Sequence, residues 1–154
     1  MKLVILTVGK EKDDLTQSLI KHFEMRILRY MPIEWMYIPH ESTAIKEGEK
    51  ILSHLKKEDY VVLLDEKGKD VKSEVIAELI ENRMVDSVKR MIFIIGGAYG
   101  VSDAVMERAN YTWKLYYTDK VSALLSAHLL VRVLSVELVY RALTIIKGEK
   151  YHHD

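Results

Sequence analysis

Cysteine is absent from this chain of 154 residues. Disulfide bonds and metal sites built on thiolates are therefore excluded, and the absence fits a reducing compartment without proving one. An excess of either charge is also absent, because 23 Lys and Arg balance 23 Asp and Glu. A strongly basic nucleic-acid binder is thereby excluded, so any contact with RNA must come from a local patch.

Long hydrophobic runs are missing as well. No stretch reaches the roughly 20 apolar residues of a membrane-spanning helix. The opening MKLVILTVGKEK has too short an apolar run for a signal peptide. We therefore expect a cytoplasmic protein. The length and the 49% hydrophobic content suit one globular domain, which we place over residues 1–154.

Prolines are scarce, and the two present, Pro32 and Pro39, flank a predicted strand. Short apolar runs predict strands at 2–8, 33–38, 60–64, 91–95 and, more weakly, 113–117. After the third strand, the stretch DEKGKD at 65–70 is expected to turn the chain.

Predicted helices alternate with these strands. The first begins after Asp13 or Asp14, and the second spans 43–57. The next two begin at the cap residues Ser73 and Ser102, and the last spans 127–146. The first helix is expected to bury a stripe that recurs every fourth residue, formed by Leu15, Leu19, Phe23 and Ile27. This alternation predicts an α/β fold, with a mostly parallel sheet covered by helices on both faces.

Two of the predicted strand ends are chemically unusual. One continues as LDEKGK from Leu64, and the other as GGAYG from Gly96 to Gly100. Ligands of parallel sheets bind at the carboxyl ends of strands, and glycines let a ligand approach the backbone closely. The glycine pattern matches neither G-x-G-x-x-G nor a P-loop. A ligand site and a simple tight turn therefore remain equally good interpretations.

The last predicted helix carries two polar stripes. They consist of His128, Arg132 and Ser135 on one line and Glu137, Arg141 and Thr144 on the opposite line. Two apolar sectors lie between them, which indicates a helix with two neighbours. The sheet would be one neighbour, and a second subunit is a natural candidate for the other. The alternative is that the chain itself overlays this helix.

Several segments together resemble a known family. VVLLDEKGKDVKSEVIAELI, FIIGGAYGVSDAV and LVYRALTIIKGEKYHHD resemble, in order and spacing, the RlmH family of SPOUT methyltransferases. The segments LVILTVGK and KEGEKIL resemble it too, so the resemblance covers nearly the whole chain. It implies a single-domain SPOUT fold with a C-terminal trefoil knot, which is rare among proteins, and a homodimer.

The resemblance also implies an activity. Members of this family use S-adenosylmethionine to methylate N3 of a pseudouridine in helix 69 of large-subunit ribosomal RNA, in assembled ribosomes. The implied partners are ribosomal RNA and a second copy of the chain, with no metal and no membrane. The implied cofactor-binding residues are Leu64, Gly96, Gly97 and Gly100, together with Ser122, Ala123, Leu124, Leu125 and Ser126.

The segment from Ser122 to Ser126 departs from the family pattern Ser-x-Ser-Lys-Met-Thr-Phe-Pro-His, because its Lys, Phe and Pro are missing. Two alternatives therefore stay open. The chain could be a SPOUT enzyme that methylates another RNA, or a non-catalytic ribosome-binding module with a degenerate cofactor loop.

Methylation at N3 requires that the imide proton leave or that charge on the carbonyl oxygens be stabilised. The candidates near the end of the chain are His128, Arg132, Arg141, Tyr151 and His152. Arginine suits phosphate or enolate-like oxygen, and histidine can accept a proton near neutral pH. We expect the tail from Gly148 onward to fold back near the cofactor, where Tyr151 and His152 would line the nucleotide side of the site. The adjacent His152 and His153 lack a carboxylate at ligand spacing, which disfavours a metal site.

Overall fold

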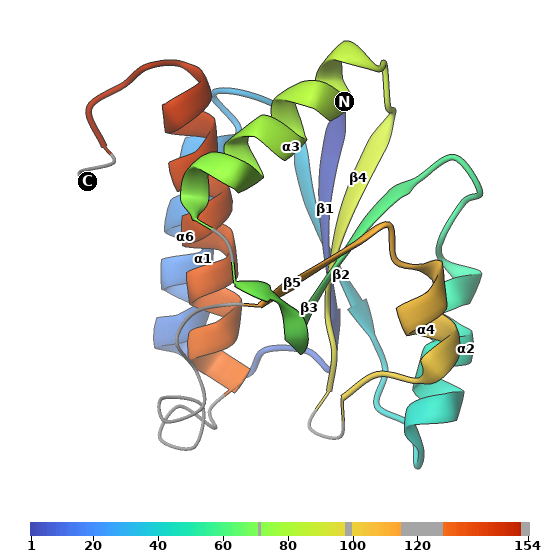
Figure 1. The fold of residues 1–154 in the computed structure, drawn as a ribbon. Coiled ribbons are helices and arrows are strands. Elements are labelled where there is room, and N and C mark those ends of the chain that lie inside the picture. The colour runs from blue at the N-terminus through green and yellow to red at the C-terminus, as the bar shows by residue number, and fades with distance from the viewer. Residues whose placement is uncertain (71, 98–99, 115–127, 152–154) are drawn as a thin grey trace.

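A computed structural model describes residues 1–70, 72–97, 100–114 and 128–151 of the chain. Its five strands form one parallel sheet in the order β2-β1-β4-β3-β5 (Figure 1). The strands are β1 (Lys2–Val8), β2 (Ile33–Ile38), β3 (Tyr60–Asp70), β4 (Arg90–Ile95) and β5 (Tyr111–Lys114). The helices are α1 (Asp14–Ile27), α2 (Ala44–Ser53), α3 (Ser73–Val85), α4 (Asp103–Arg108) and α6 (His128–Ile146). The predicted α/β fold class is confirmed.

Helices cover both faces of the sheet. In Figure 1, α1, α3 and α6 lie on one face, while α2 and α4 lie on the other. The side chains of β1 divide accordingly, because successive strand residues point to opposite faces. Leu3 and Ile5 join the core under α1, α3 and α6, whereas Val4 and Leu6 join the core under α2 and α4.

The stretch at 65–70 was predicted to be a turn, and this is wrong. β3 continues to Asp70 and pairs with β5 on both sides of an irregularity between Leu64 and Lys69, which both align with Trp113. Gly68 makes this possible, because a Cβ there would lie 2.8 Å from backbone atoms of Thr112. The glycine serves a close approach between two strands rather than a reversal of the chain.

The buried face of α1 also differs from the prediction. The predicted stripe is correct at Ile27, which is buried, and at Phe23, which packs against the core. It is wrong at Leu15 and Leu19, which are 72% and 42% exposed, and Thr16 and Ile20 are buried instead. A four-residue step advances about 40° around a helix, so a stripe of three such steps drifts by about 120°. Of the two residues expected to cap this helix, Asp13 is the N-cap. Its side chain accepts a hydrogen bond from the Thr16 amide.

Of the two expected serine N-caps, one is confirmed and the other is wrong. Ser102 caps α4 and accepts from the Val105 amide. Ser73 is instead the first residue of α3, and Lys72 holds the N-cap position without a side-chain hydrogen bond.

Helix α6 packs on the sheet between α1 and α3 (Figure 1). Its apolar sectors therefore have neighbours within the chain, which favours the alternative that the chain itself overlays this helix. Arg132 and Ser135 of one polar stripe are buried, whereas Leu130 is exposed. The homodimer and the trefoil knot stay predictions. The path through 115–127, on which a knot depends, lies outside the described residues.

Candidate functional site

The carboxyl edge of the sheet brings two predicted cofactor positions together. Leu64 aligns with Ile95 in the parallel ladder of β3 and β4, and Gly96 follows Ile95 directly. Leu64 is buried, while Gly96 and Gly97 are half-buried. The two strand ends that the sequence singled out are therefore neighbours at one edge of the sheet.

The glycine turn after β4 has one closed side and one open side. A Cβ on Gly96 would lie 2.7 Å from the Val101 side chain, so this glycine is required by the packing of the turn itself. Gly100 has a φ of +77°, and a Cβ there would meet no atom of the described residues within 4 Å. Its amide donates to the Gly97 carbonyl at 3.0 Å, which closes the turn. The exposed backbone at Gly100 fits a ligand that approaches the main chain.

A buried carboxylate beneath this turn escaped the sequence analysis. Glu47 of α2 is nearly fully buried, and its Oε1 would lie 3.1 Å from a Cβ on Gly97. Its Oε2 accepts from the Glu41 amide at 3.2 Å and lies 3.6 Å from Nδ1 of His40. The glutamate thus connects the loop after β2 with the turn after β4. Its place within KEGEKIL was the only available signal.

Arg132 is occupied by contacts within the chain. One guanidinium nitrogen donates to the carbonyls of Val8 and Gly9, at 2.8 Å each, and the other lies 3.4 Å from Oε2 of Glu11. Arg132 and Glu11 are both buried. Glu11 also accepts from the amides of the next two residues through Oε1. This arrangement fastens the first turns of α6 to the end of β1.

Arg141 and Tyr151 meet at one carboxylate, that of Glu137. The Arg141 guanidinium donates to Oε1 of Glu137 at 2.7 Å, and the Tyr151 hydroxyl donates to the same oxygen at 3.0 Å. The guanidinium also lies over the Tyr151 ring, 5.3 Å from its centre. Burial raises the pKa of Tyr151, as do the charge and the hydrogen bond of Glu137. The phenol therefore stays protonated at neutral pH and acts as a donor.

Glu137, Arg141 and Tyr151 lie farther along α6 from the carboxyl edge of the sheet, the edge that carries the glycine turn (Figure 1). Figure 1 shows the tail leaving α6 at the end of the helix that is remote from the carboxyl edge of the sheet. From there it folds back, so that Tyr151 contacts Glu137 and Tyr140 of α6. The tail does fold back, but these contacts lie on α6 and not at the turn of the same chain.

The remaining predicted residues can be placed only in part. His128 is the first residue of α6, and the structure describes its backbone but not its side chain. Outside the described residues lie Ser122, Ala123, Leu124, Leu125, Ser126 and His152.

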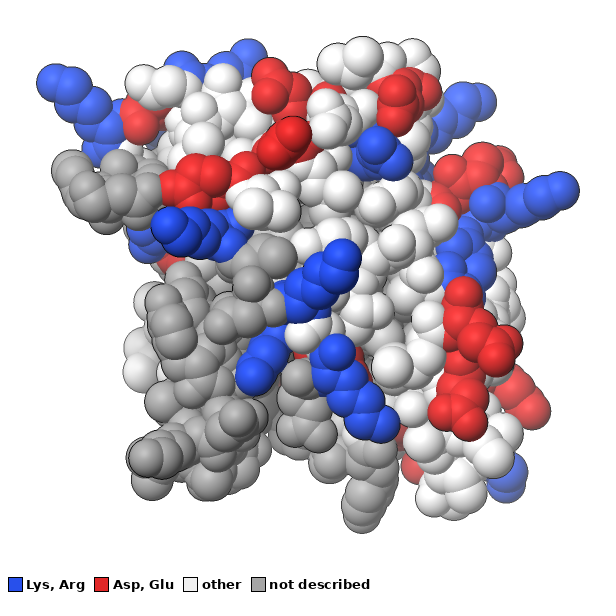
Figure 2. All heavy atoms as spheres, viewed as in Figure 1, with Lys and Arg blue, Asp and Glu red and all other residues white. Residues whose placement is uncertain are grey.

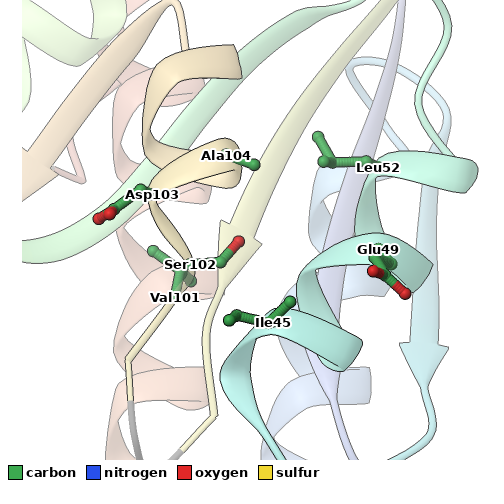
Figure 3. A pocket seen from close by; sticks show the side chains of 7 residues that line it. All are labelled: Ile45, Glu49, Leu52, Val101, Ser102, Asp103 and Ala104. Atoms are coloured by element: carbon green, nitrogen blue, oxygen red, sulfur yellow. The ribbon is translucent and has the colours of Figure 1, made fainter.

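A separate pocket of about 430 Å³ lies between α2 and α4 (Figure 3). Its lining comprises Ile45, Glu49, Leu52, Val101, Ser102, Asp103 and Ala104. Figure 3 shows Leu52 reaching toward α4 and Asp103 pointing away from α2. The Ser102 hydroxyl is already engaged as the cap of α4. The pocket therefore offers mainly apolar contact, and the glycine turn remains the candidate site.

Charge on the surface is local. Figure 2 shows Lys and Arg side chains gathered where β3 and β5 reach the surface. Three exposed lysines of this region, Lys67, Lys69 and Lys72, form what we call the β3 basic patch. Among the described residues, no three His, Asp or Glu side chains are grouped as metal ligands, and no helix is long and apolar enough to span a membrane.

Comparison with known proteins covers the whole chain. Residues 1–152 match the sequence model of a family described as predicted SPOUT methyltransferase. A protein of Christiangramia forsetii named ribosomal RNA large subunit methyltransferase H is 38% identical, with 99% of both chains aligned. A protein of the same name from Cytophaga hutchinsonii is 38% identical over 99% of this chain and 100% of its own. One from Clostridium botulinum is 35% identical over 99% of both. The chain therefore belongs to the SPOUT methyltransferase family.

Proposed function

We propose that this protein transfers a methyl group from S-adenosylmethionine to N3 of a pseudouridine in helix 69 of large-subunit ribosomal RNA, in assembled ribosomes of the cytoplasm. The observation that carries the proposal is the full-length match to relatives named for methylation of that ribosomal subunit's RNA. The open turn at the carboxyl edge of a parallel sheet supports it, because ligands bind at such edges.

The cofactor would lie at the glycine turn. Leu64, Gly96, Gly97 and Gly100 would hold it, largely through backbone contact, with the segment from Ser122 to Ser126 as the third side. S-adenosylmethionine, when bound, supplies an activated methyl group that is transferred by in-line displacement. The protein's part in such a step is to position the reacting atoms and exclude water.

The groups around Glu137 would serve the base that is methylated. Arg141 would stabilise negative charge on a carbonyl oxygen as the N3 proton leaves. Tyr151 would donate a hydrogen bond, since its raised pKa keeps it protonated. His128 and His152 are the proposed proton acceptors. Arg132, fastened to β1 and Glu11, would act by holding α6 at the carboxyl edge.

A second subunit would bring these groups together with the turn. Leu15 and Leu19 of α1 and Leu130 of α6 are exposed, and both helices begin at the carboxyl edge. Leu15 and Leu19 are one helical turn apart and therefore share a face of α1, and exposed apolar surface of this kind marks interaction sites. We propose that this leucine face pairs with its copy in a homodimer, and that the tail of one subunit completes the site of the other. The β3 basic patch would contact RNA phosphate.

The test is to incubate the protein with labelled S-adenosylmethionine and ribosomes from a strain that lacks the modification, and then to locate the label. We expect one labelled pseudouridine in helix 69. Cofactor binding without a label there, but with a label in another RNA, would establish the SPOUT enzyme of different specificity. Failure to bind the cofactor would favour the second candidate, a non-catalytic ribosome-binding module. That candidate remains open because the segment before His128 lacks the Lys, Phe and Pro of the family pattern.

A further inference from the structure

The C-terminal tail turns back because α6 ends in a defined motif. Gly148 has a φ of +68°, its amide donates to the Ile145 carbonyl at 3.0 Å, and the Glu149 amide donates to the Thr144 carbonyl at 2.9 Å. These two bonds around a left-handed glycine form a Schellman cap. The motif reverses the chain at Gly148, so the residues that follow return toward α6.

A contact between the two ends of the chain then holds the reversed tail. The Tyr30 hydroxyl donates to Oε2 of Glu149 at 2.6 Å, across 119 residues of sequence. Tyr30 itself is anchored just after α1, where its amide donates to the Ile27 carbonyl at 2.8 Å. Burial first, and then the hydrogen bond and charge of Glu149, raise the pKa of Tyr30 to about 12. The phenol is therefore a persistent donor to this carboxylate.

The rings of Tyr30 and Tyr151 both pack against the ring of Tyr140. The centre of the Tyr140 ring lies 6.2 Å from that of Tyr30 and 4.7 Å from that of Tyr151. Arg26 of α1 lies over the same Tyr140 ring at 5.8 Å. Tyr30 thus holds Glu149 with its hydroxyl and supports, through Tyr140, the ring two residues further along the tail.

We propose that Tyr30 is a positioning residue for the reaction: its hydrogen bond to Glu149 latches the tail, so that Tyr151 stays hydrogen-bonded to Glu137. The inference rests on the proposed function, because it assigns the latch to a tail that takes part in methyl transfer. Tyr30 itself touches neither the cofactor nor the base and would act only through the tail.

The test compares Tyr30→Phe, Glu149→Ala and Glu149→Gln with the wild type in two assays. The first is limited trypsin digestion, followed by mass spectrometry, at Lys147 and Lys150, which bracket the latch. The second is methyl incorporation into unmodified ribosomes, with kcat and KM measured separately. Tyr111→Phe is the matched control, because it removes a hydroxyl from a partly buried tyrosine at the start of β5.

We expect Tyr30→Phe and Glu149→Ala to accelerate cleavage at both lysines and to lower kcat about three- to tenfold, the range of one lost hydrogen bond. Calorimetric affinity for S-adenosylmethionine should stay within about twofold, and circular dichroism should be unchanged. Glu149→Gln keeps an acceptor oxygen and should recover most of the activity. The double variant Tyr30→Phe/Glu149→Ala should be no worse than either single variant.

Other outcomes overturn the proposal. Unchanged cleavage in Tyr30→Phe would show that the hydroxyl does not hold the tail. Faster cleavage with unchanged kcat would show a latch without a positioning role. A wild-type protein that labels no ribosome would refute the proposed function and with it the positioning role, while the trypsin assay would still decide whether Tyr30 holds the tail.

Discussion

Arg132 and Glu11 lie 121 residues apart in the sequence and form a buried ion pair, with 3.4 Å between a guanidinium nitrogen and Oε2. The same guanidinium donates to two carbonyls at the end of β1. A planar group with several fixed donors suits such a junction better than an ammonium does. The pair therefore explains how the start of α6 is placed beside the edge that carries the glycine turn.

Replacing Arg132 with Lys should destabilise the protein. Lysine cannot make the contacts to both carbonyls and to Glu11 at once, and breaking a buried pair of this kind costs roughly 3 kcal/mol. Urea unfolding monitored by circular dichroism measures the change. The control is Arg29→Lys, at an exposed arginine just after α1. An unchanged free energy of unfolding together with lost methylation would assign Arg132 to the RNA instead.

Replacing Gly100 with Asn should weaken cofactor binding. Asparagine tolerates the left-handed backbone that Gly100 adopts, so the fold should survive, while its side chain would fill the open side of the turn. Calorimetry with S-adenosylmethionine is the measurement. Gly148→Asn is the matched control, since Gly148 also has a positive φ and open surroundings but lies past the far end of α6. Gly96→Val is a less informative test of cofactor binding, because its side chain would clash with Val101 and disturb the turn itself. Equal affinities for the Gly100 and Gly148 variants would remove Gly100 from the site.

Placing a charge on the leucine face should dissociate the proposed dimer. Leu15→Glu and Leu19→Glu would each put a carboxylate into an interface that now holds apolar surface, at little cost to a monomer in which these side chains are exposed. Light scattering at micromolar concentration reports the mass. Val85→Glu, at an exposed valine at the end of α3, is the control. A wild-type monomer, or a dimer that tolerates both substitutions, would contradict the assignment of this face.

Two truncations should separate the roles of the tail. Removing 152–154 leaves the Gly148 cap, the Tyr30 contact and Tyr151 in place, and should abolish methylation with unchanged folding and cofactor affinity. Removing everything from Glu149 onward also deletes the latch and one bond of the Schellman cap. That variant should unfold at slightly lower urea concentration, by about 1 kcal/mol in free energy. Near-normal methylation by the shorter truncation would make the last three residues bystanders.

The latch should weaken in alkali. The pKa of Tyr30 lies near 12 in the folded protein and near 10 in an unfolded chain, so folding strengthens the hold on its proton. Its contribution to stability is therefore complete below about pH 10 and is lost as pH rises toward about 12. The measurement is the difference in unfolding free energy between wild type and Tyr30→Phe across this range. If the difference in unfolding free energy stayed constant over this pH range, the hydrogen bond from Tyr30 to Glu149 would not contribute to stability in the way proposed.

The sequence predicted the sheet well because its strands carry local signals. β4 is a nearly continuous apolar run, and the two prolines delimit β2. The continuation of β3 beyond Leu64 was missed because Gly68 has the same local appearance in a turn and in a close strand contact. Only the register of Lys69 and Asp70 with β5, a strand distant in the sequence, decides between them.

The candidate site was predicted only where backbone geometry decides it. The glycine turn could be found, because a left-handed residue and a strand end are both visible in the sequence. The partners of Arg132 could not, since a polar stripe on a helix does not show whether it faces solvent or buried carbonyls. The Tyr30–Glu149 contact carries no local signal at all, because its residues lie at opposite ends of the chain.

The position of α6 between α1 and α3 also bears on synthesis of the protein. Val136, Val139, Ala142 and Leu143 of α6 pack in the same core as Leu3 and Ile5 of β1. The first strand is therefore fully buried only after α6, the last helix of the described residues, has been synthesised. Contacts so distant in sequence slow folding. A nascent chain that lacks α6 leaves the part of this sheet face between α1 and α3 uncovered, and exposed apolar surface promotes aggregation. We therefore expect chains interrupted before His128 to be insoluble, and folding to finish only after release from the translating ribosome.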